Sequence, residues 1–350
     1  MKIKIGRIYL GNGHPSFVVA EVSGNHGGKI SRALKIIHAA KKAGANAVKL
    51  QTYTADSITL KSNRRDFIIS RNSPWFKKKN LWNLYNFAHT PIEWHKRLFQ
   101  EAKKIKLEIF SSPFDESSVD FLETLDCSAY KVASPEINHI PLLERVAKTK
   151  KPVILSTGLS TYNDIKLAIK TIRSFGNNKI VVLKCTTAYP SDLKEQNLLT
   201  IPDIKKNFKV LAGLSDHTKG KIAAISSAAL DADIIEKHFN LDDKRKTTDS
   251  FFSAGNKFFK DMVQEIRDVE KSLGKVSYKI SKASKRNLNA KRSIYVTKDI
   301  LKGQKINKNN IKIIRLGYGL PPKYFKKILG RRVNDNLKRG DRMLLRNIKF

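Results

Sequence analysis

Two short segments in the middle of the sequence each place a histidine at the end of an apolar run. They are residues 213–218 (GLSDHT) and 236–239 (EKHF), with His217 and His238. If the two runs are neighbouring strands, their ends bring two imidazoles together. Two imidazoles can hold one divalent metal with coordination positions left open, and such a metal polarises a substrate oxygen. Two unrelated histidines satisfied by hydrogen bonds are the alternative, and the residues that end the other runs argue against it.

Polar residues end the other apolar runs as well, and their types suit an anionic, phosphorylated ligand. Ammonium groups gathered in one cleft need an anion, and lysines with Ser and Thr hydroxyls are typical of phosphate binding. Glu21 among these cations stays ionised and can act as a general base, or it can simply pair with Lys49 or Lys131. The polar residues at the run ends are Glu21, Lys49, Gln51, Ser111, Ser112, Lys131, Ser134, Glu136, Ser156, Thr157, Lys184, Thr186, Thr187, Tyr189, Ser215, His217 and His238.

Short apolar runs that alternate with helical segments predict the elements that carry these residues. Between Phe17 and about Leu273 most runs are followed by one amphipathic segment, such as Tyr162–Ser174. This alternation favours a closed (β/α)8 TIM barrel, whose strand ends share one mouth. An open doubly wound sheet is the rival, but no glycine-rich dinucleotide motif follows the first run. The predicted strands are residues 17–20, 47–50, 107–110, 129–132, 152–155, 180–183, 210–214 and 233–236.

Composition indicates a cytoplasmic protein. Cys127 and Cys185 are the only cysteines in 350 residues, which is too few for a disulfide framework. We expect neither a secretory signal nor a transmembrane helix, because no apolar run approaches the ~18–20 residues that a span needs. The net charge of +37 could serve a nucleic acid, a membrane surface or anionic substrates. Since the basic runs are scattered and lack interleaved aromatic residues, we expect solvated basic faces, with no nucleic acid and no membrane as partner.

The remaining segments predict the domain organisation. The long connection 52–92 contains Trp75, Trp82 and Tyr85, and such loops at the C-terminal face of a barrel build substrate pockets. We expect a catalytic barrel over residues 1–273 and a linker over the Lys- and Ser-rich residues 274–291. Beyond it, residues 299–303 (DILKG) are echoed by 335–340 (DNLKRG), which predicts a small pseudo-symmetric β-rich domain over 292–350.

The ordered motifs resemble those of the sialic acid synthase family, enzymes that condense phosphoenolpyruvate with an amino-sugar aldehyde. Residues 292–296 (RSIYV) and 315–320 (RLGYGL) are similar to the antifreeze-like (SAF, β-clip) domain of that family. The stretches most similar to its pseudaminate-forming branch are residues 81–85 (LWNLY), 90–95 (TPIEWH), 112–116 (SPFDE) and 317–324 (GYGLPPKY). The barrel motifs are residues 20–26 (AEVSGNH), 48–52 (VKLQT), 111–114 (SSPF), 130–134 (YKVAS), 155–158 (LSTG), 213–218 and 236–239.

The resemblance implies a reaction and a role for individual residues. His217 and His238 would bind Mn²⁺, or Mg²⁺ or Co²⁺ in its place, to polarise the open-chain aldehyde, with Glu21 as base or water-positioning group. Phosphoenolpyruvate would be held by Lys49, Ser112, Lys131, Ser134, Ser156 and Ser215. The sugar, 2,4-diacetamido-2,4,6-trideoxy-L-altrose, would contact Gln51, Glu136, Thr187, Tyr189, Asp249 and Arg315. Arg315 would reach a neighbouring subunit's site in a homodimer whose C-terminal domain is swapped onto the neighbouring barrel.

Some positions depart from the family's pattern, and other functions stay open. Thr187 stands where sialate-forming members carry Asn, which argues against N-acetylmannosamine, and residues 244–249 lack the Gly and Pro usual before Asp249. The nearest alternative is synthesis of N,N'-diacetyllegionaminate or N-acetylneuraminate from another sugar. A Schiff-base aldolase that uses Lys131 is a different enzyme class. The charge alone suggests a nucleic-acid-binding protein.

Overall fold

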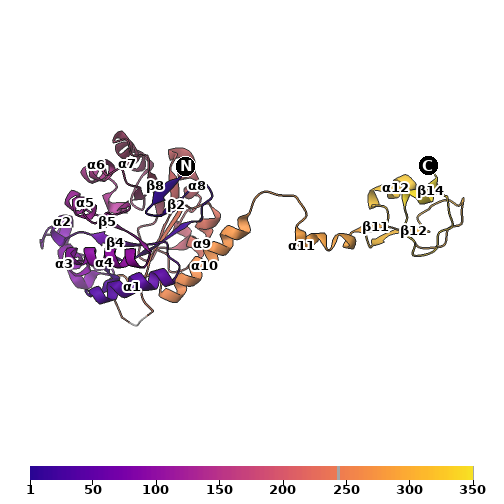
Figure 1. Cartoon of the computed structure of the whole chain (residues 1–350). Coiled ribbons are helices and arrows are strands. Elements are labelled where there is room, and N and C mark those ends of the chain that lie inside the picture. The colour runs from indigo at the N-terminus through magenta and orange to yellow at the C-terminus, as the bar shows by residue number, and fades with distance from the viewer. Residues whose placement is uncertain (243–244, 350) are drawn as a thin grey trace. The chain divides into compact units, whose positions relative to one another are not determined.

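A closed parallel barrel forms the N-terminal part of the protein in a computed structural model that describes residues 1–242 and 245–349 (Figure 1). The sheet closes in the order β10-β3-β4-β5-β6-β7-β8-β9. The predicted TIM barrel is therefore confirmed, and the alternative of an open doubly wound sheet is wrong. The barrel strands are β3 (Phe17–Glu21), β4 (Ala47–Thr52), β5 (Glu108–Pro113), β6 (Tyr130–Val132), β7 (Val153–Ser156), β8 (Ile180–Cys185), β9 (Leu211–Asp216) and β10 (Ile234–His238).

Amphipathic helices surround the barrel, and each buries one apolar face against the strands (Figure 1). In α10 (Asn256–Leu273) the buried residues Phe259, Met262, Val263 and Ile266 follow spacings of three and four, which place them on one side of the helix. The strands are covered on both faces and therefore appear in the sequence as continuous apolar runs. The other helices of the ring are α1 (Ile30–Lys42), α4 (Ile92–Lys104), α5 (Glu116–Glu123), α6 (Ile140–Lys148), α7 (Tyr162–Ser174), α8 (Thr200–Phe208) and α9 (Ile222–Ala229).

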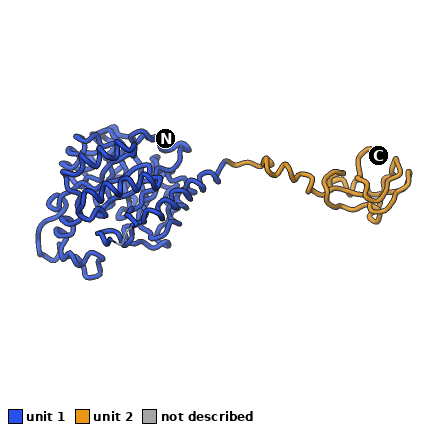
Figure 2. The backbone as a smooth tube through the Cα atoms, turned by 60° about the horizontal axis from the view of Figure 1, so that its bottom comes forward, with its two compact units in different colours: residues 1–274 blue, residues 275–350 orange. Residues whose placement is uncertain are grey.

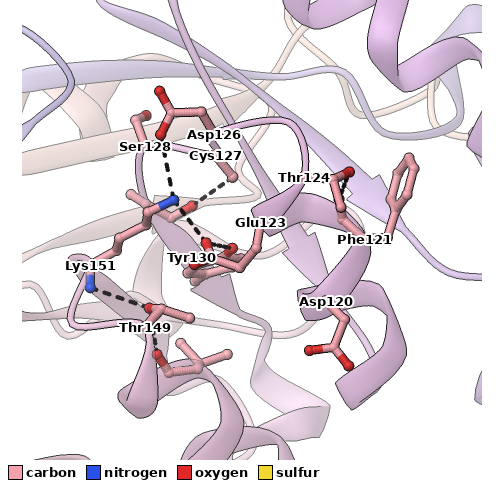
Figure 3. A network of polar contacts seen from close by, with 12 residues as sticks. Asp120, Phe121, Glu123, Thr124, Asp126, Cys127, Ser128, Tyr130, Thr149 and Lys151 are labelled. Carbon is pink, nitrogen blue, oxygen red and sulfur yellow. Dashed lines mark hydrogen bonds and ion pairs between the residues drawn. The ribbon is translucent and has the colours of Figure 1, made fainter.

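The amino ends of the strands carry structural contacts. A hairpin of β1 (Ile3–Ile5) and β2 (Ile8–Leu10) buries apolar side chains in the barrel core. Figure 3 shows a polar network in which Lys151, just before β7, lies 2.8 Å from Glu123 at the end of α5 and 3.7 Å from Asp126. The Tyr130 hydroxyl at the start of β6 donates to the same Glu123 carboxylate. The network ties one helix to two strand starts, at the end of the barrel where contacts stabilise the fold.

The long connection between β4 and β5 is helical in part. It contains α2 (Ala55–Ile58) and α3 (Leu81–Ala88), with short 3-10 turns at Arg65–Phe67 and Phe76–Lys78. The Asn80 side chain accepts from the Asn83 backbone N–H and so caps the start of α3. No helix in the two described ranges is long and apolar enough to cross a bilayer.

The chain divides into two compact units, residues 1–274 and 275–350 (Figure 2). The second has its own apolar core, which includes Ile294 of β11 and Ile311 of β12. The two copies of the weak repeat pair with each other, because Ile300 and Leu337 exchange backbone hydrogen bonds of 2.8 Å. This unit contains α11 (Lys282–Lys285), β11 (Arg292–Val296), β12 (Ile311–Arg315), α12 (Phe325–Ile328), β13 (Arg332–Val333) and β14 (Ile348–Lys349).

Three residues lie outside the described part of the chain: Asp243, Lys244 and Phe350. The stretch predicted at 244–249 is therefore described from residue 245, and the domain predicted at 292–350 is described as far as residue 349. In the segment predicted as a linker, the structure has α11 and a 3-10 turn at Leu288–Ala290, and all of its residues from 275 to 291 are exposed.

Candidate active site

The register of the barrel brings the predicted residues to one height at its carboxyl end. His238 of β10 pairs with Glu21 of β3, and Glu21 pairs in turn with Lys49 of β4. Side chains alternate along a strand, so Glu236 and His238 share one face of β10, whereas Lys237 lies on the other. The neighbouring strand β9 carries the other histidine just past its last residue.

Two carboxylates hold the Lys49 ammonium at the floor of this mouth. Its Nζ lies 3.0 Å from Glu21 Oε2 and 2.9 Å from Glu236 Oε1, and all three side chains are buried. Burial would lower the pKa of Lys49, but the two carboxylates reverse that and raise it. Burial raises the pKa of Glu21 to about 7, against the opposing charge of Lys49. For Glu236 burial would raise the pKa, but Lys49 and Lys131 keep it below its usual value.

Lys131 is buried without such a partner. Its Nζ donates to the Val132 carbonyl oxygen at 3.3 Å and, within the described residues, makes no ion pair. Burial lowers its pKa to about 8. A buried ammonium of this kind is stabilised by a bound anion, because the anion supplies a direct counter-charge, whereas Glu236 acts on Lys131 without forming an ion pair.

Hydroxyl groups at the end of β7 and just after β8 also lack partners among the described residues. Among the described residues, the buried oxygens Ser156 Oγ and Thr187 Oγ1 form no hydrogen bond, although buried polar atoms normally do. Gly158 lies between them and the Ser134 hydroxyl, which accepts its N–H at 2.9 Å. A Cβ on Gly158 would meet Thr187 Oγ1 at 2.0 Å and Ser134 Oγ at 3.0 Å, so only glycine lets these two hydroxyls approach the backbone here.

The two histidines lie side by side above the lysines, with ring centroids 5.4 Å apart. His217 Nδ1 is 2.9 Å from the Thr186 carbonyl oxygen, which can only accept, so Nδ1 carries the hydrogen and Nε2 keeps its lone pair. His238 Nδ1 is buried and has no partner in the described chain. Burial lowers the pKa of His238 well below its usual value; burial would also lower that of His217, but Cys185 and the Thr186 carbonyl raise it.

These free ring nitrogens fit a divalent metal held by two imidazoles. In the part of the chain that the structure describes, no group of three or more His, Cys, Asp or Glu side chains forms a complete metal cluster. Two protein ligands would leave most positions of a bound ion to substrate and water, as a Lewis-acid site requires.

Four of the residues predicted to contact the sugar, Gln51, Asp249, Tyr189 and Glu136, belong to the barrel unit. Gln51 donates to Glu21 Oε1 at 2.9 Å, and Asp249, buried, accepts from the Ser23 hydroxyl and, at 3.3 Å, from the Gly24 N–H. Asp249 therefore lies at the mouth even though its segment lacks the usual Gly and Pro. Tyr189 packs on His217 with ring centroids 4.5 Å apart. Burial raises the pKa of Glu136 to about 7, and one of its oxygens has no partner among the described residues.

Three other predicted residues, Ser112, Ser215 and Arg315, lie in different parts of the protein. Ser112 accepts from Lys49 at 3.4 Å, and Ser215 donates to Glu236 at 3.4 Å, so both belong to the floor. Arg315 ends β12 in the second compact unit. His26, a further histidine of the first motif, is buried against Trp94 and accepts from the Gly28 N–H, so it orders its own loop.

Three contributors to the site were missed in the sequence. Glu236 lies two residues before His238 in the same motif, and this spacing predicts that both side chains face the barrel interior. Cys185 places its sulfur 3.9 Å from His217 Nδ1, and Phe252 packs on His238 with ring centroids 4.6 Å apart. Phe252 follows the last strand in a segment without regular structure, where no periodicity points inward.

Together the fold and the site define a class: a TIM-barrel protein whose mouth gathers buried lysines, hydroxyls and two histidines, with a second, β-rich C-terminal unit. The NeuB family model matches residues 36–278, and the SAF domain model matches residues 291–341. The chain belongs to the NeuB family, and the predicted sialic acid synthase family and SAF domain are confirmed.

Relatives cover almost the whole chain. A pseudaminic acid synthase from Helicobacter pylori is 44% identical over 326 residues, 93% of this chain and 95% of the relative. An N,N'-diacetyllegionaminic acid synthase from Legionella pneumophila is 32% identical over 345 residues, 97% of this chain and 96% of the relative. The crystal structure of the spore coat polysaccharide biosynthesis protein SpsE from Bacillus subtilis superposes with a TM-score of 0.68 at 31% identity, covering 100% of this chain and 99% of that one.

Proposed function

We propose that this protein is a pseudaminic acid synthase, a transferase that joins phosphoenolpyruvate, 2,4-diacetamido-2,4,6-trideoxy-L-altrose and water to give pseudaminate and phosphate. The observation that carries the proposal is the 44% identity to such a synthase along nearly the full length of both chains. The legionaminate-forming alternative has a relative at only 32% identity. The mouth of the barrel supports the reaction class, because it combines an unpaired buried cation with hydroxyls that lack partners.

Phosphoenolpyruvate fits the recess around Lys131. The ammonium would receive a direct counter-charge, and Ser134 and Ser156 would donate to the phosphate or carboxylate oxygens. Lys49, Ser112 and Ser215 complete the floor, where the two carboxylates already neutralise Lys49. Lys131 rather than Lys49 therefore contributes the larger part of the attraction for the anion.

His217 and His238 would hold the divalent ion, Mn²⁺ or a substitute. When bound there, this ion supplies Lewis-acid polarisation of the aldehyde oxygen. The buried imidazoles would keep the aldehyde close to the enol group of phosphoenolpyruvate, and Gln51, Asp249 and Tyr189 would contact the rest of the open-chain sugar. Proximity of the two reacting carbons is the main contribution of these side chains.

Glu21 handles the proton of the attacking water. The methylene carbon of phosphoenolpyruvate bonds to the aldehyde carbon, which becomes a hydroxyl-bearing centre, and the adjacent enol carbon becomes cationic. Water adds to that cation, and one of its protons passes through Glu21 to the former aldehyde oxygen, which becomes the hydroxyl. The carbon–oxygen bond to phosphate then breaks, and the remaining proton of the added water leaves with the phosphate as the keto group forms. A carboxylate with a pKa near 7 suits this work at neutral pH, and Lys49 at 3.0 Å stabilises its ionised form.

The assembly and location are also proposed. We infer a homodimer in which Arg315 of the SAF domain completes the site on a neighbouring barrel, because an anionic product at the mouth would attract a guanidinium. We place the enzyme in the cytoplasm, where its two cysteines, both free and buried, would stay reduced.

Phosphate release from phosphoenolpyruvate tests the function directly. The assay compares 2,4-diacetamido-2,4,6-trideoxy-L-altrose with the sugars used for legionaminate and sialate synthesis, each with Mn²⁺ and with chelator. We expect fast release with the altrose derivative alone, lost with chelator. Release with another sugar in preference to the altrose derivative would contradict the proposed substrate, and release without any sugar would contradict a condensing synthase.

A further inference from the structure

Four aromatic side chains from three separate segments form a continuous wall beside the two histidines. We call Trp75, Tyr189, Phe251 and Phe252 the aromatic wall. Trp75 comes from the long connection after β4, Tyr189 follows β8, and the two phenylalanines follow β10. Their ring contacts link segments that are far apart in the sequence, so only the folded barrel assembles the wall.

The contacts of the wall run in a closed circuit. Trp75 lies 5.6 Å from Tyr189 and 5.9 Å from Phe251, Phe251 lies 4.9 Å from Phe252, and Phe252 lies 5.0 Å from Tyr189, all between ring centroids. The circuit touches both histidines, since Tyr189 packs on His217 and Phe252 on His238. The ring of Tyr189 thus lies between Trp75 and His217 and contacts both.

Trp75 has its polar atom satisfied by the backbone. The indole N–H donates to the Thr248 carbonyl oxygen at 3.0 Å, next to the buried Asp249. The ring therefore offers only apolar surface to a ligand. Trp75 is half-buried and Phe251 is 41% exposed, so the upper part of the wall keeps surface that a sugar can cover.

We propose that Trp75 is a specificity-determining residue that selects a methyl-bearing, deoxygenated acetamido sugar. The inference rests on the proposed function and names the chemistry by which the site recognises its sugar. An acetamido or deoxy methyl group gains by leaving water for an aromatic surface, whereas a hydroxyl placed there loses hydrogen bonds that the wall cannot replace. The polar residues Gln51 and Asp249 lie nearby for the hydroxyl groups that the sugar retains.

Trp82 in the same connection provides a matched control. Its indole N–H donates to Asp56 at 2.8 Å, and the Lys61 ammonium lies 4.7 Å above its ring. Both contacts keep it within its own loop. Among the described residues it has no ring contact with the aromatic wall or with the histidines.

The experiment measures kcat/KM for two sugars that differ in one atom. They are the diacetamido-trideoxy sugar and its analogue with a hydroxyl at carbon 6. We expect Trp75→Ala to lower kcat/KM for the deoxy sugar by about 10- to 100-fold and to reduce the preference over the hydroxylated analogue, which is the range for a methyl-sized group in an apolar pocket. The KM for phosphoenolpyruvate should stay within about twofold in the same assays.

Two further variants separate specificity from folding. Trp75→Phe keeps an apolar ring and should retain most of the sugar preference, and Trp82→Ala should behave like the wild type. An unchanged preference in Trp75→Ala, or an equal loss of preference in Trp82→Ala, would overturn the inference. A Trp75→Ala protein that loses thermal stability but keeps its sugar preference would overturn it as well. If the wild type releases no phosphate with the deoxy sugar at all, the proposed function fails and this inference fails with it.

Discussion

Two buried lysines at the barrel mouth differ because, among the described residues, carboxylates form direct ion pairs with only one of them. Lys49 lies between Glu21 and Glu236, whereas Lys131 has a backbone carbonyl and no ion pair among the described residues. A buried charge without a counter-charge destabilises the free protein and favours the bound anion. Lys131 should therefore favour binding of an anionic substrate and at the same time lower the stability of the free protein.

Replacement of Lys131 by Met should show this opposition. The pKa of Lys131 is lowered to about 8 in the folded state, so between pH 8 and about 10.5 the unfolded chain binds more protons, and stability rises with pH over that range. At pH 7 the variant should be more stable than the wild type by up to about 3 kcal/mol, with the difference shrinking toward pH 10. Thermal unfolding across this pH range tests it.

The same variant should bind phosphoenolpyruvate poorly, with a KM raised at least about 100-fold by loss of the charge-assisted contact. Lys35→Met, which removes an exposed lysine on α1, is the comparison for general charge loss. A Lys131→Met protein that is less stable than the wild type at pH 7, or that keeps its KM, would contradict the assignment.

The histidine pair makes a second prediction at this scale. His217→Ala and His238→Ala should each abolish metal-dependent phosphate release and weaken Mn²⁺ binding measured by electron paramagnetic resonance, because one imidazole cannot hold the ion alone. His38→Ala, which changes an exposed histidine on α1, should leave both properties intact. Turnover like that of the wild type in either site variant would refute the metal site.

At the scale of elements, a fully buried ion pair joins the two strands that carry the histidines. Lys237 Nζ lies 2.7 Å from Asp216 Oδ2, and it also donates to the Thr218 carbonyl oxygen at 2.5 Å. The exposed fractions of the two side chains are 1% and 0%, so each charge depends on the other. The pair fixes the ends of β9 and β10 relative to each other, and with them His217 and His238.

Removal of one partner of this buried ion pair should strongly destabilise the fold. We expect Lys237→Met to lower the free energy of unfolding by about 3–5 kcal/mol, since Asp216 would stay buried and unpaired. The double variant Asp216→Ala with Lys237→Met should recover part of that loss in a denaturant-unfolding cycle. Losses that simply add in the double variant would show that the two charges do not depend on each other.

The strands show how far apolar runs predict element bounds. The run at residues 17–20 became β3 (Phe17–Glu21), nearly as expected. The run at 107–110 became β5 (Glu108–Pro113), longer by the polar residues Ser111 and Ser112. These serines look like a loop in the sequence, but in the barrel they continue the hydrogen-bonded ladder beside Leu50 and Gln51. Ser112 carries its hydroxyl to the floor, whereas the Ser111 hydroxyl contacts Thr52 on the other face of the sheet.

At the scale of the whole molecule, the SAF domain has a compact core of its own, and the role that we propose for it in catalysis depends on Arg315. Subunit mixing tests whether that residue acts on a neighbouring barrel. Arg315→Ala and His217→Ala should each be inactive alone. After unfolding and refolding together, half of the dimers are mixed and each has one complete site, so about a quarter of wild-type activity should return. No recovery above the separate variants would exclude action between subunits.

The sequence by itself determined the barrel and the kind of chemistry at its mouth. Parallel strands buried on both faces must appear as apolar runs, and their carboxyl ends must meet, so the residues that follow the runs belong to one site. For this reason Glu21, Lys49, Lys131, His217 and His238 could be grouped before any coordinates were known.

Only the tertiary structure decided which of these groups are paired and which are free. Glu236 forms an ion pair with Lys49 because of the direction of one side chain on β10, and for the same reason Lys131 has no ion pair among the described residues. Trp75 reaches the histidines through Tyr189, more than a hundred residues away along the chain. Side-chain direction and long-range contacts follow from packing in three dimensions, which local periodicity does not encode.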